Sequence, residues 1–260
     1  MLIAVTRPVS PTLAQCELTH LARQVIDVQR AADQHTAYER LLGSLGATVV
    51  RAPAAAELPD AVFVEDAALV LDEVAILTRP GAPSRLAELA GVAEVLGRYR
   101  AVVPLRAPAT LDGGDVLRSG RTLFVGRSSR TNAEGIEQLS RLLAAFDYEV
   151  VPVAFEGCLH LKSAVTGLGD GLLLLNPAWV SAADFRGRES VAIDPGEPYA
   201  ANTLSIAGTL VFPAQYPLTL EQLVRRGFRV APIDCSELAK AEGAVTCCSL
   251  VFEAKVGRDD

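Results

Sequence analysis

The stretch DAALVLDEVAILT, residues 66–78, contains two short apolar runs that flank the polar pair Asp72 and Glu73. Two β-rich runs around a polar or glycine-containing turn predict a β-hairpin. The same pattern returns in DVLRSGRTLFVG (115–126), SAVTGLGDGLLLLN (163–176) and NTLSIAGTLVFP (202–213). A unit that recurs at a spacing of roughly 45 residues indicates a repeat architecture.

The two ends of the sequence supply a fifth unit. The apolar run CSLVFEA covers residues 248–254, and MLIAVT covers residues 1–6. We expect these two runs to pair as neighbouring strands, which would close the repeats into a ring.

Amphipathic segments follow most of the hairpins. Apolar residues three and four apart lie on one face of a helix. The segments that meet this pattern are Ala31, His35, Tyr38, Leu42 and Leu45 before Gly46; Leu86, Leu89, Ala93 and Leu96; Ile136, Leu139, Leu143 and Phe146; and Leu220, Leu223 and Val224 before Gly227. Thr219 and Gln222 match a capping box at the start of the last helix.

Short β-rich runs such as EVVPV and FRVAPI follow these helices. The repeating unit is therefore strand–strand–helix–strand (ββαβ). Five such units in a closed ring predict a single α/β domain spanning residues 1–260, a small α/β propeller.

The composition excludes several classes of protein. The chain has 260 residues, 50% of them apolar, and a net charge of −7 without a dense Lys/Arg run. Nucleic acid and anionic membrane are therefore not expected partners. The N-terminus lacks a charged signal-peptide region, and no apolar run is long enough to span a bilayer, so we expect a soluble cytoplasmic protein.

The cysteines do not form a recognisable structural set. They are Cys16, Cys158, Cys235, Cys247 and Cys248. Their number is odd and no CxxC pair occurs, which argues against a disulfide framework and a structural zinc site. Cys16 and His20 lie four apart, but two ligands do not make a zinc site.

Residues able to do chemistry precede the hairpins. They are Asp60, Glu65 and Asp66 before the first, Asp112 and Asp115 before the second, His160 before the third, and Cys247 before the last run. If the hairpins are equivalent blades, these positions converge near the ring axis. A thiol, an imidazole and carboxylates in one pocket are typical of an active site, with Cys247 as the nucleophile.

Each of these residues also has a structural interpretation. A cysteine at the start of a strand is more often buried packing, which is our interpretation of Cys248. A histidine between leucines, such as His160, is more often part of a core, and we assign no function to His35. Asp115 is expected to be a structural hydrogen-bonding group. Recurrence at one position of successive repeats favours the shared site.

Six motifs occur in an order that resembles a known family. They are LPDAVFVEDAAL, TRPGAPSR, TLDGGDVL, FVGRSSRTN, CLHLKSA and TCCS. Together they resemble the dimethylarginine dimethylaminohydrolases (dimethylargininases), members of the guanidino-group-modifying superfamily. The resemblance covers nearly the whole chain and implies a five-bladed pseudosymmetric α/β propeller. The superfamily's arginine deiminases and amidinotransferases are generally longer, so length favours the dimethylargininase branch.

The resemblance implies a hydrolase that converts asymmetric dimethylarginine or monomethylarginine to citrulline and dimethylamine or methylamine. Cys247 would form a covalent thiouronium intermediate, and His160 would act first as general acid and then as base. Asp112 would orient His160; family members carry Asp or Glu there. No metal or organic cofactor is implied.

The resemblance also implies how the substrate is bound. Carboxylates match the planar N–H fork of a guanidinium by charge-assisted hydrogen bonds. The implied contacts are Asp60, Glu65 and Asp66 with the guanidinium, Arg85 and Arg130 with the α-carboxylate, and the backbone carbonyls of Leu18 and Ala241 with the α-amino group. Leu18 lies in the polar stretch QCELTH, which we interpret as a lid that excludes water.

Two alternatives remain open from the sequence. One is a deiminase-type hydrolase of free arginine or another guanidine compound, and the other is a non-catalytic module that binds arginine-like ligands. The side faces of a propeller can pair, which leaves a homodimer open as well.

Overall fold

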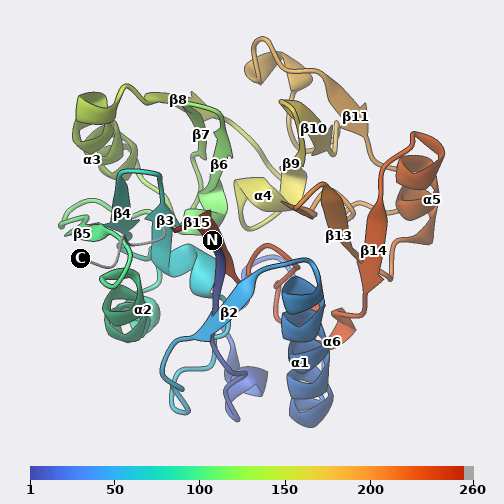
Figure 1. The fold of residues 1–260 in the computed structure, drawn as a ribbon, viewed down its shortest axis with the longest axis horizontal. Coiled ribbons are helices and arrows are strands. Elements are labelled where there is room, and N and C mark those ends of the chain that lie inside the picture. Colours follow the sequence, from blue (N-terminus) through green and yellow to red (C-terminus); the bar gives the residue numbers. More distant parts are fainter. Residues whose placement is uncertain (255–260) are drawn as a thin grey trace.

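The computed structural model describes residues 1–254, which form five three-stranded sheets arranged as a ring (Figure 1). In every sheet the middle strand pairs antiparallel with one neighbour and parallel with the other. This is the ββαβ unit that the hairpin repeats predict, and the five-bladed α/β propeller is confirmed. The last six residues of the predicted domain 1–260 lie outside the described residues.

Each sheet is one blade of three strands, the middle one hydrogen-bonded to both others. The blades are β15 (Leu250–Glu253), β1 (Leu2–Thr6) and β2 (Thr48–Arg51); β3 (Ala68–Val70), β4 (Val74–Leu77) and β5 (Ala101–Pro104); β6 (Val116–Ser119), β7 (Thr122–Gly126) and β8 (Glu149–Val153); β9 (Val165–Gly169), β10 (Leu172–Leu175) and β11 (Ser190–Ala192); β12 (Leu204–Ile206), β13 (Thr209–Pro213) and β14 (Val230–Ile233).

Helices connect the second and third strands of four blades, because parallel neighbours need a long crossover. These four crossover helices are α1 (Val28–Ser44), α2 (Leu89–Leu96), α3 (Ala133–Leu143) and α5 (Pro217–Arg225). Two short helices, α4 (Leu161–Ala164) and α6 (Ser236–Ala239), lie between blades. Within residues 1–254, no helix combines the length and the apolar character needed to cross a membrane.

The first strand of each blade lies nearest the ring axis. Residues of β15, β3, β6, β9 and β12 line a central channel that is open on one side of the ring. The apolar core is divided among five buried clusters, one for each junction around the ring. The channel lining is mainly apolar and includes the charged pair Glu65 and Lys162, while the blades hold to their neighbours by apolar packing.

The chain ends close the ring as the sequence predicts. β1 pairs antiparallel with β15, with Ile3 opposite Phe252 and Val5 opposite Leu250. The N-terminal ammonium of Met1 donates to the carbonyl of Ala254 at 3.0 Å. The inner strand of this blade thus comes from the far end of the sequence.

The predicted capping box of α5 is wrong. The helix begins at Pro217, two residues before Thr219. Thr219 is fully buried, and its hydroxyl accepts the N–H of Asp194 at 3.1 Å. The carboxylate of Glu197 instead accepts the N–H groups of Thr219 and the residue before it, both at 2.8 Å. The cap therefore comes from a separate segment, whereas Gly227, at φ +89°, ends the helix as expected.

The packing of Phe252 provides a test of ring closure. Its side chain is buried, lies edge-on to Tyr99 with ring centroids 5.5 Å apart, and is covered by the guanidinium of Arg100 at 5.6 Å. We expect F252A to lose about 3–5 kcal/mol of unfolding free energy in urea denaturation, because removal of the phenyl group leaves a cavity. Val224, which is 51% exposed, is the control, and V224A should change that energy by less than about 0.5 kcal/mol. An F252A protein as stable as the parent would contradict this role.

Candidate active site

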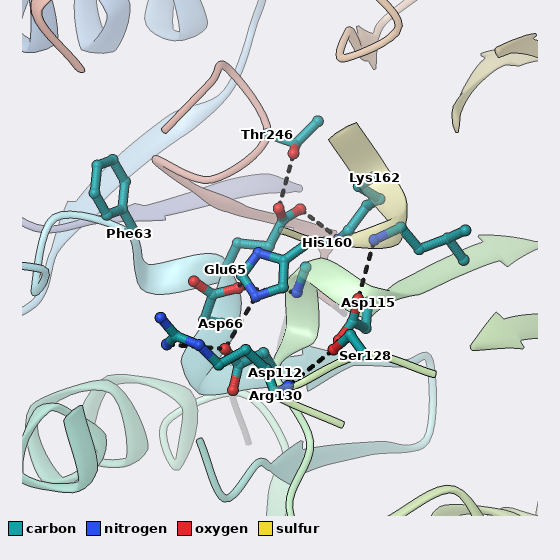
Figure 2. Close-up of polar contacts among 12 residues, drawn as sticks. Phe63, Glu65, Asp66, Asp112, Asp115, Ser128, Arg130, His160, Lys162 and Thr246 are labelled. Atoms are coloured by element: carbon teal, nitrogen blue, oxygen red, sulfur yellow. Dashed lines mark hydrogen bonds and ion pairs between the residues drawn. The ribbon is translucent and has the colours of Figure 1, made fainter. Parts of the chain in front are cut away.

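A single helical turn precedes the inner strand of three successive blades. A 3-10 turn (Val64–Ala67) leads into β3, another (Gly113–Asp115) leads into β6, and α4 leads into β9 with His160 at its N-cap. These turns meet at one end of the ring axis, and Figure 2 shows their side chains pointing toward one another. The convergence predicted from the repeats therefore occurs.

Two glycines allow the turns to approach this closely. A Cβ on Gly113 would lie 2.0 Å from the carbonyl oxygen of Glu65. A Cβ on Gly114 would lie 2.6 Å from Nδ1 of His160 and 2.8 Å from Oδ1 of Asp66. The sequence LDGGD thus places backbone where a side chain would displace the imidazole and a carboxylate.

His160 lies between two carboxylates. Its Nε2 is 3.0 Å from Oδ2 of Asp112, which is fully buried, and its Nδ1 is 3.8 Å from Oδ1 of Asp66. Burial alone would lower the pKa of His160, but Asp66, the hydrogen bond to Asp112, and Asp115 together raise it to about 9. The imidazole is therefore a cation at neutral pH, with N–H groups directed at both carboxylates.

Asp66 is held as an anion. Its carboxylate accepts from Nη1 of Arg85 at 2.6 Å and from the N–H of Gly114 at 3.0 Å. Burial would raise the pKa of Asp66, yet the charges of His160 and Arg85 bring it down to about 2. This carboxylate stays ionised beside the pocket.

Glu65 faces the central channel. Its carboxylate accepts from Nζ of Lys162 at 2.5 Å and from the hydroxyl of Thr246 at 2.8 Å. Burial raises its pKa against the opposing effect of Lys162. The N–H of Glu65 donates to the carbonyl of Cys247 at 3.1 Å. Glu65 thus lines the central channel and not the pocket, whereas Asp60 and Asp66 are part of the pocket wall.

Cys247 is half-buried and lines the pocket. Burial, Glu65 and Asp66 all raise the pKa of its thiol, so the sulfur is protonated in the unliganded protein. Its neighbour Cys248 is 2% exposed and contacts the carbonyl of Ala244 at 3.4 Å. Cys248 is packing, as expected.

The pocket brings most of the predicted residues together. It is lined by Glu17, Asp60, Phe63, Asp66, Arg85, Arg130, Leu159, His160, Ala241, Glu242 and Cys247. Asp112 contacts His160 from outside this lining. The predicted residues Leu18 and Glu65 do not line the pocket, although Glu17, next to Leu18, does.

The two predicted arginines differ in how strongly they are engaged. Arg85 binds the carboxylates of Asp66 and Glu88, at 2.6 and 2.9 Å, and two backbone carbonyls. Arg130 donates to the hydroxyl of Thr19 at 3.3 Å and lies 3.8 Å from Asp112. Arg130 therefore has more donor capacity for a ligand than Arg85.

Several residues that shape the site were not predicted. Lys162 stands two positions after His160 in the motif CLHLKSA and neutralises Glu65. Glu88 follows Arg85 by three positions, a spacing at which side chains on a helical turn meet. Glu242 lines the pocket and carries no motif signal.

Asp115 is structural, as the sequence predicts. Its carboxylate accepts from the hydroxyls of Ser128 and Thr131 at 2.6 and 2.7 Å and from the N–H of Leu161 at 3.0 Å. It ties the second hairpin to α4 and fixes the backbone beside His160.

Three residues have the geometry of a metal-binding group. Ligand atoms of Asp66, Asp112 and His160 lie within 4.8 Å of one another. An imidazole must be neutral to bind a metal ion, whereas these carboxylates hold His160 in its charged form. Arg85 also occupies one oxygen of Asp66. The three residues therefore suit a protonated imidazole between two carboxylates better than a metal ion.

Comparisons with known proteins agree with this geometry. No model of a protein family matches the chain. N(G),N(G)-dimethylarginine dimethylaminohydrolase of Streptomyces coelicolor is 40% identical over 249 residues, which cover 95% of each chain. The protein of the same name from Pseudomonas aeruginosa is 36% identical over 236 residues, 90% of this chain and 92% of the relative.

A solved structure shares the fold. It is the Pseudomonas aeruginosa enzyme, as a cysteine-to-serine mutant complexed with citrulline, with a TM-score of 0.91, 35% identity and coverage of 96% of this chain and 98% of that one. The similarity in sequence and structure extends over nearly the whole chain. The protein therefore belongs to the dimethylarginine dimethylaminohydrolase family, whose members are hydrolases that act on guanidino compounds.

Proposed function

We propose that this protein hydrolyses asymmetric dimethylarginine or monomethylarginine to citrulline and dimethylamine or methylamine. The observation that carries the proposal is a half-buried thiol, Cys247, in one pocket with a charged imidazole and an ionised carboxylate. Citrulline, the expected product, is the ligand in the solved structure of the Pseudomonas aeruginosa relative.

The pocket walls suit a flat, methylated cation. Asp66 and Asp60 would accept hydrogen bonds from the guanidinium. Glu65 is already paired with Lys162 and would act on the substrate only from outside the pocket lining. Phe63 and Leu159 offer apolar surface for the methyl groups.

The amino-acid end of the substrate would bind at the lid side of the pocket. Arg130, assisted by Arg85, would hold the α-carboxylate. The carbonyls of Leu18 and Ala241 would accept from the α-ammonium. The segments that carry those two residues are joined by hydrogen bonds in which the N–H groups of Thr19 and His20 donate to the carboxylate of Glu242.

The substrate itself would activate the nucleophile. Thiolate is the reactive form of cysteine, and the carboxylates near Cys247 oppose its formation in the absence of substrate. A bound guanidinium neutralises those carboxylates and places a positive charge beside the sulfur, so the thiol proton is lost to solvent. The sulfur then bonds to the central guanidinium carbon and gives a tetrahedral adduct.

His160 would serve both halves of the reaction. It donates a proton to the departing amine as the carbon–nitrogen bond breaks, which leaves a thiouronium on Cys247. The neutral imidazole then accepts a proton from water as the water oxygen bonds to the same carbon. Citrulline forms when the carbon–sulfur bond breaks and the thiolate leaves. Asp112 orients the ring throughout.

The nucleophile is tested by replacing its sulfur. We expect C247S to reduce citrulline formation from asymmetric dimethylarginine by more than about 1,000-fold, because serine lacks an adjacent neutral base. A colorimetric citrulline assay measures this, with free arginine assayed in parallel. The control C235S changes a buried cysteine outside the pocket and should keep its activity.

Two results of that assay would contradict the proposal. Unchanged activity in C247S would remove the nucleophile assignment. Turnover of arginine at a higher kcat/KM than methylated arginine would favour the deiminase-type alternative, and binding without turnover in the parent protein would favour a binding module.

The charge on His160 is tested by removing its partner. We expect D112N to lower the pKa of His160 from about 9 by roughly 1–3 units, because a carboxylate within hydrogen-bond distance stabilises the imidazolium. NMR titration of the chain's 3 histidines measures this shift. Because His160 must be protonated to act as general acid, the pH above which kcat declines should fall together with the pKa of His160. The value of kcat should drop about 100-fold or more.

The matched control for this titration is D72N, which alters an exposed aspartate paired with Arg118. The pKa of His160 in D72N should equal that of the parent. An unshifted pKa of His160 in D112N would contradict the role of Asp112, and Asp66 and Asp115 would then account for the raised value.

A further inference from the structure

The segment predicted to cover the pocket is held mainly by side chains of other segments. We define the lid as residues 17–27; between residues 17 and 26, its described backbone groups make no hydrogen bond to another backbone group. Instead, the N–H of Glu17 donates to Asp60 at 3.1 Å, and the N–H of Asp27 donates to Glu237 at 2.9 Å. Lys240 donates to the carbonyl of Val25 at 3.1 Å.

Glu242 makes the largest contribution to this attachment. Its Oε2 accepts the N–H of Thr19 at 3.0 Å, and its Oε1 accepts the N–H groups of His20 and Leu21, both at 2.6 Å. Hydrogen bonds from backbone N–H groups to a carboxylate are charge-assisted and stronger than neutral ones. One side chain thus binds three consecutive residues of the lid.

The backbone at Glu242 is in a conformation that side chains rarely adopt. Its φ is +58°, in the left-handed region. The next residue, Gly243, packs so closely that a Cβ there would lie 2.1 Å from the ring of Phe63. Strained positions held by tight packing are common at functional sites, and glycine would relieve the strain at position 242.

Glu242 also lines the pocket itself. It follows Ala241, precedes the nucleophile segment and lines the pocket together with Glu17 and Cys247. Arg130, on the opposite wall, donates to the hydroxyl of Thr19 on the lid. The lid is therefore fixed to both sides of the pocket near the residues that flank Leu18.

We propose that Glu242 is a positioning residue that latches the lid over the pocket. This inference rests on the proposed function. The carboxylate of Glu242 sets the separation between the carbonyls of Leu18 and Ala241, which accept hydrogen bonds from the substrate's α-ammonium. Entry and exit of ligand require the three hydrogen bonds to break together. Glu242 contributes to substrate binding through the lid, and the reacting groups do not depend on it.

The test variant is E242G, because glycine removes the carboxylate and adopts positive φ without strain. Hydrogen exchange of the peptide 17–27 should accelerate about tenfold or more, since charge-assisted bonds that protect its amides are lost. Exchange in α1 should match the parent, which reports an intact fold. Alkylation of Cys247 by iodoacetamide, followed on its own peptide, should also accelerate.

Steady-state kinetics give the second readout. The KM for asymmetric dimethylarginine should rise about tenfold in E242G while kcat changes much less, because binding is lost and the reacting groups are kept. E242Q retains one carbonyl oxygen and should lie between E242G and the parent in exchange rate and KM. The control E221Q alters an exposed glutamate paired with Arg225 on α5 and should match the parent in all three measurements.

Each outcome decides the proposal. If hydrogen exchange in the lid of E242G is as slow as in the parent, Glu242 is not a latch, whatever the activity. If exchange is faster but KM is unchanged, Glu242 does not position the substrate. If E242G does not fold, the exchange and KM of E242Q decide in the same way. A parent protein without turnover of methylated arginine would contradict the proposed function, and lid exchange and Cys247 alkylation would still decide the latch.

Discussion

Compensation of buried negative charge is the constraint on which the centre of this ring depends. Three carboxylates lie almost without solvent at the axis, and an ion there is tolerable only when it is paired. Asp66 is paired with Arg85, Asp112 with His160, and Glu65 with Lys162. Two of these pairs join residues from different blades, so the same contacts that neutralise charge also hold the blades in register around the pocket.

The electrostatics of the pocket follow from this arrangement. Burial and the carboxylates of Glu65 and Asp66 oppose a further anion and raise the pKa of the Cys247 thiol, so it keeps its proton in the absence of substrate. A cation such as guanidinium reverses that balance when it binds.

Much of the architecture could be predicted from the sequence, because hairpins and helices depend on local periodicity. The five repeats, the pairing of residues 1–6 with 248–254, and the convergence of Asp66, Asp112 and His160 all follow from that pattern. Contacts between side chains of distant segments could not be predicted. Thr219 resembles a helix cap, yet Glu197 from another segment supplies the cap.

The same limit applies to the site. Sequence order placed Glu65 with Asp60 and Asp66, but its orientation depends on Lys162 and Thr246, which approach from two other turns. The engagement of Arg85 by Glu88 and the contacts of Glu242 with the lid are likewise set by packing. Local patterns identify which residues meet, whereas the direction of each side chain is decided by its partners.

The pairing of β1 with β15 has a consequence for how the molecule is made. More than two hundred residues separate these strands, so the contact that completes the first blade is among the most non-local in the fold. Such contacts form late, because the entropy of closing a long loop must be overcome before they stabilise anything. The strand that follows Cys247 is also among the last described segments to leave the ribosome. Chains that had not yet reached Cys247 would therefore carry the imidazole and the acidic residues without the sulfur, and they would lack the proposed nucleophile.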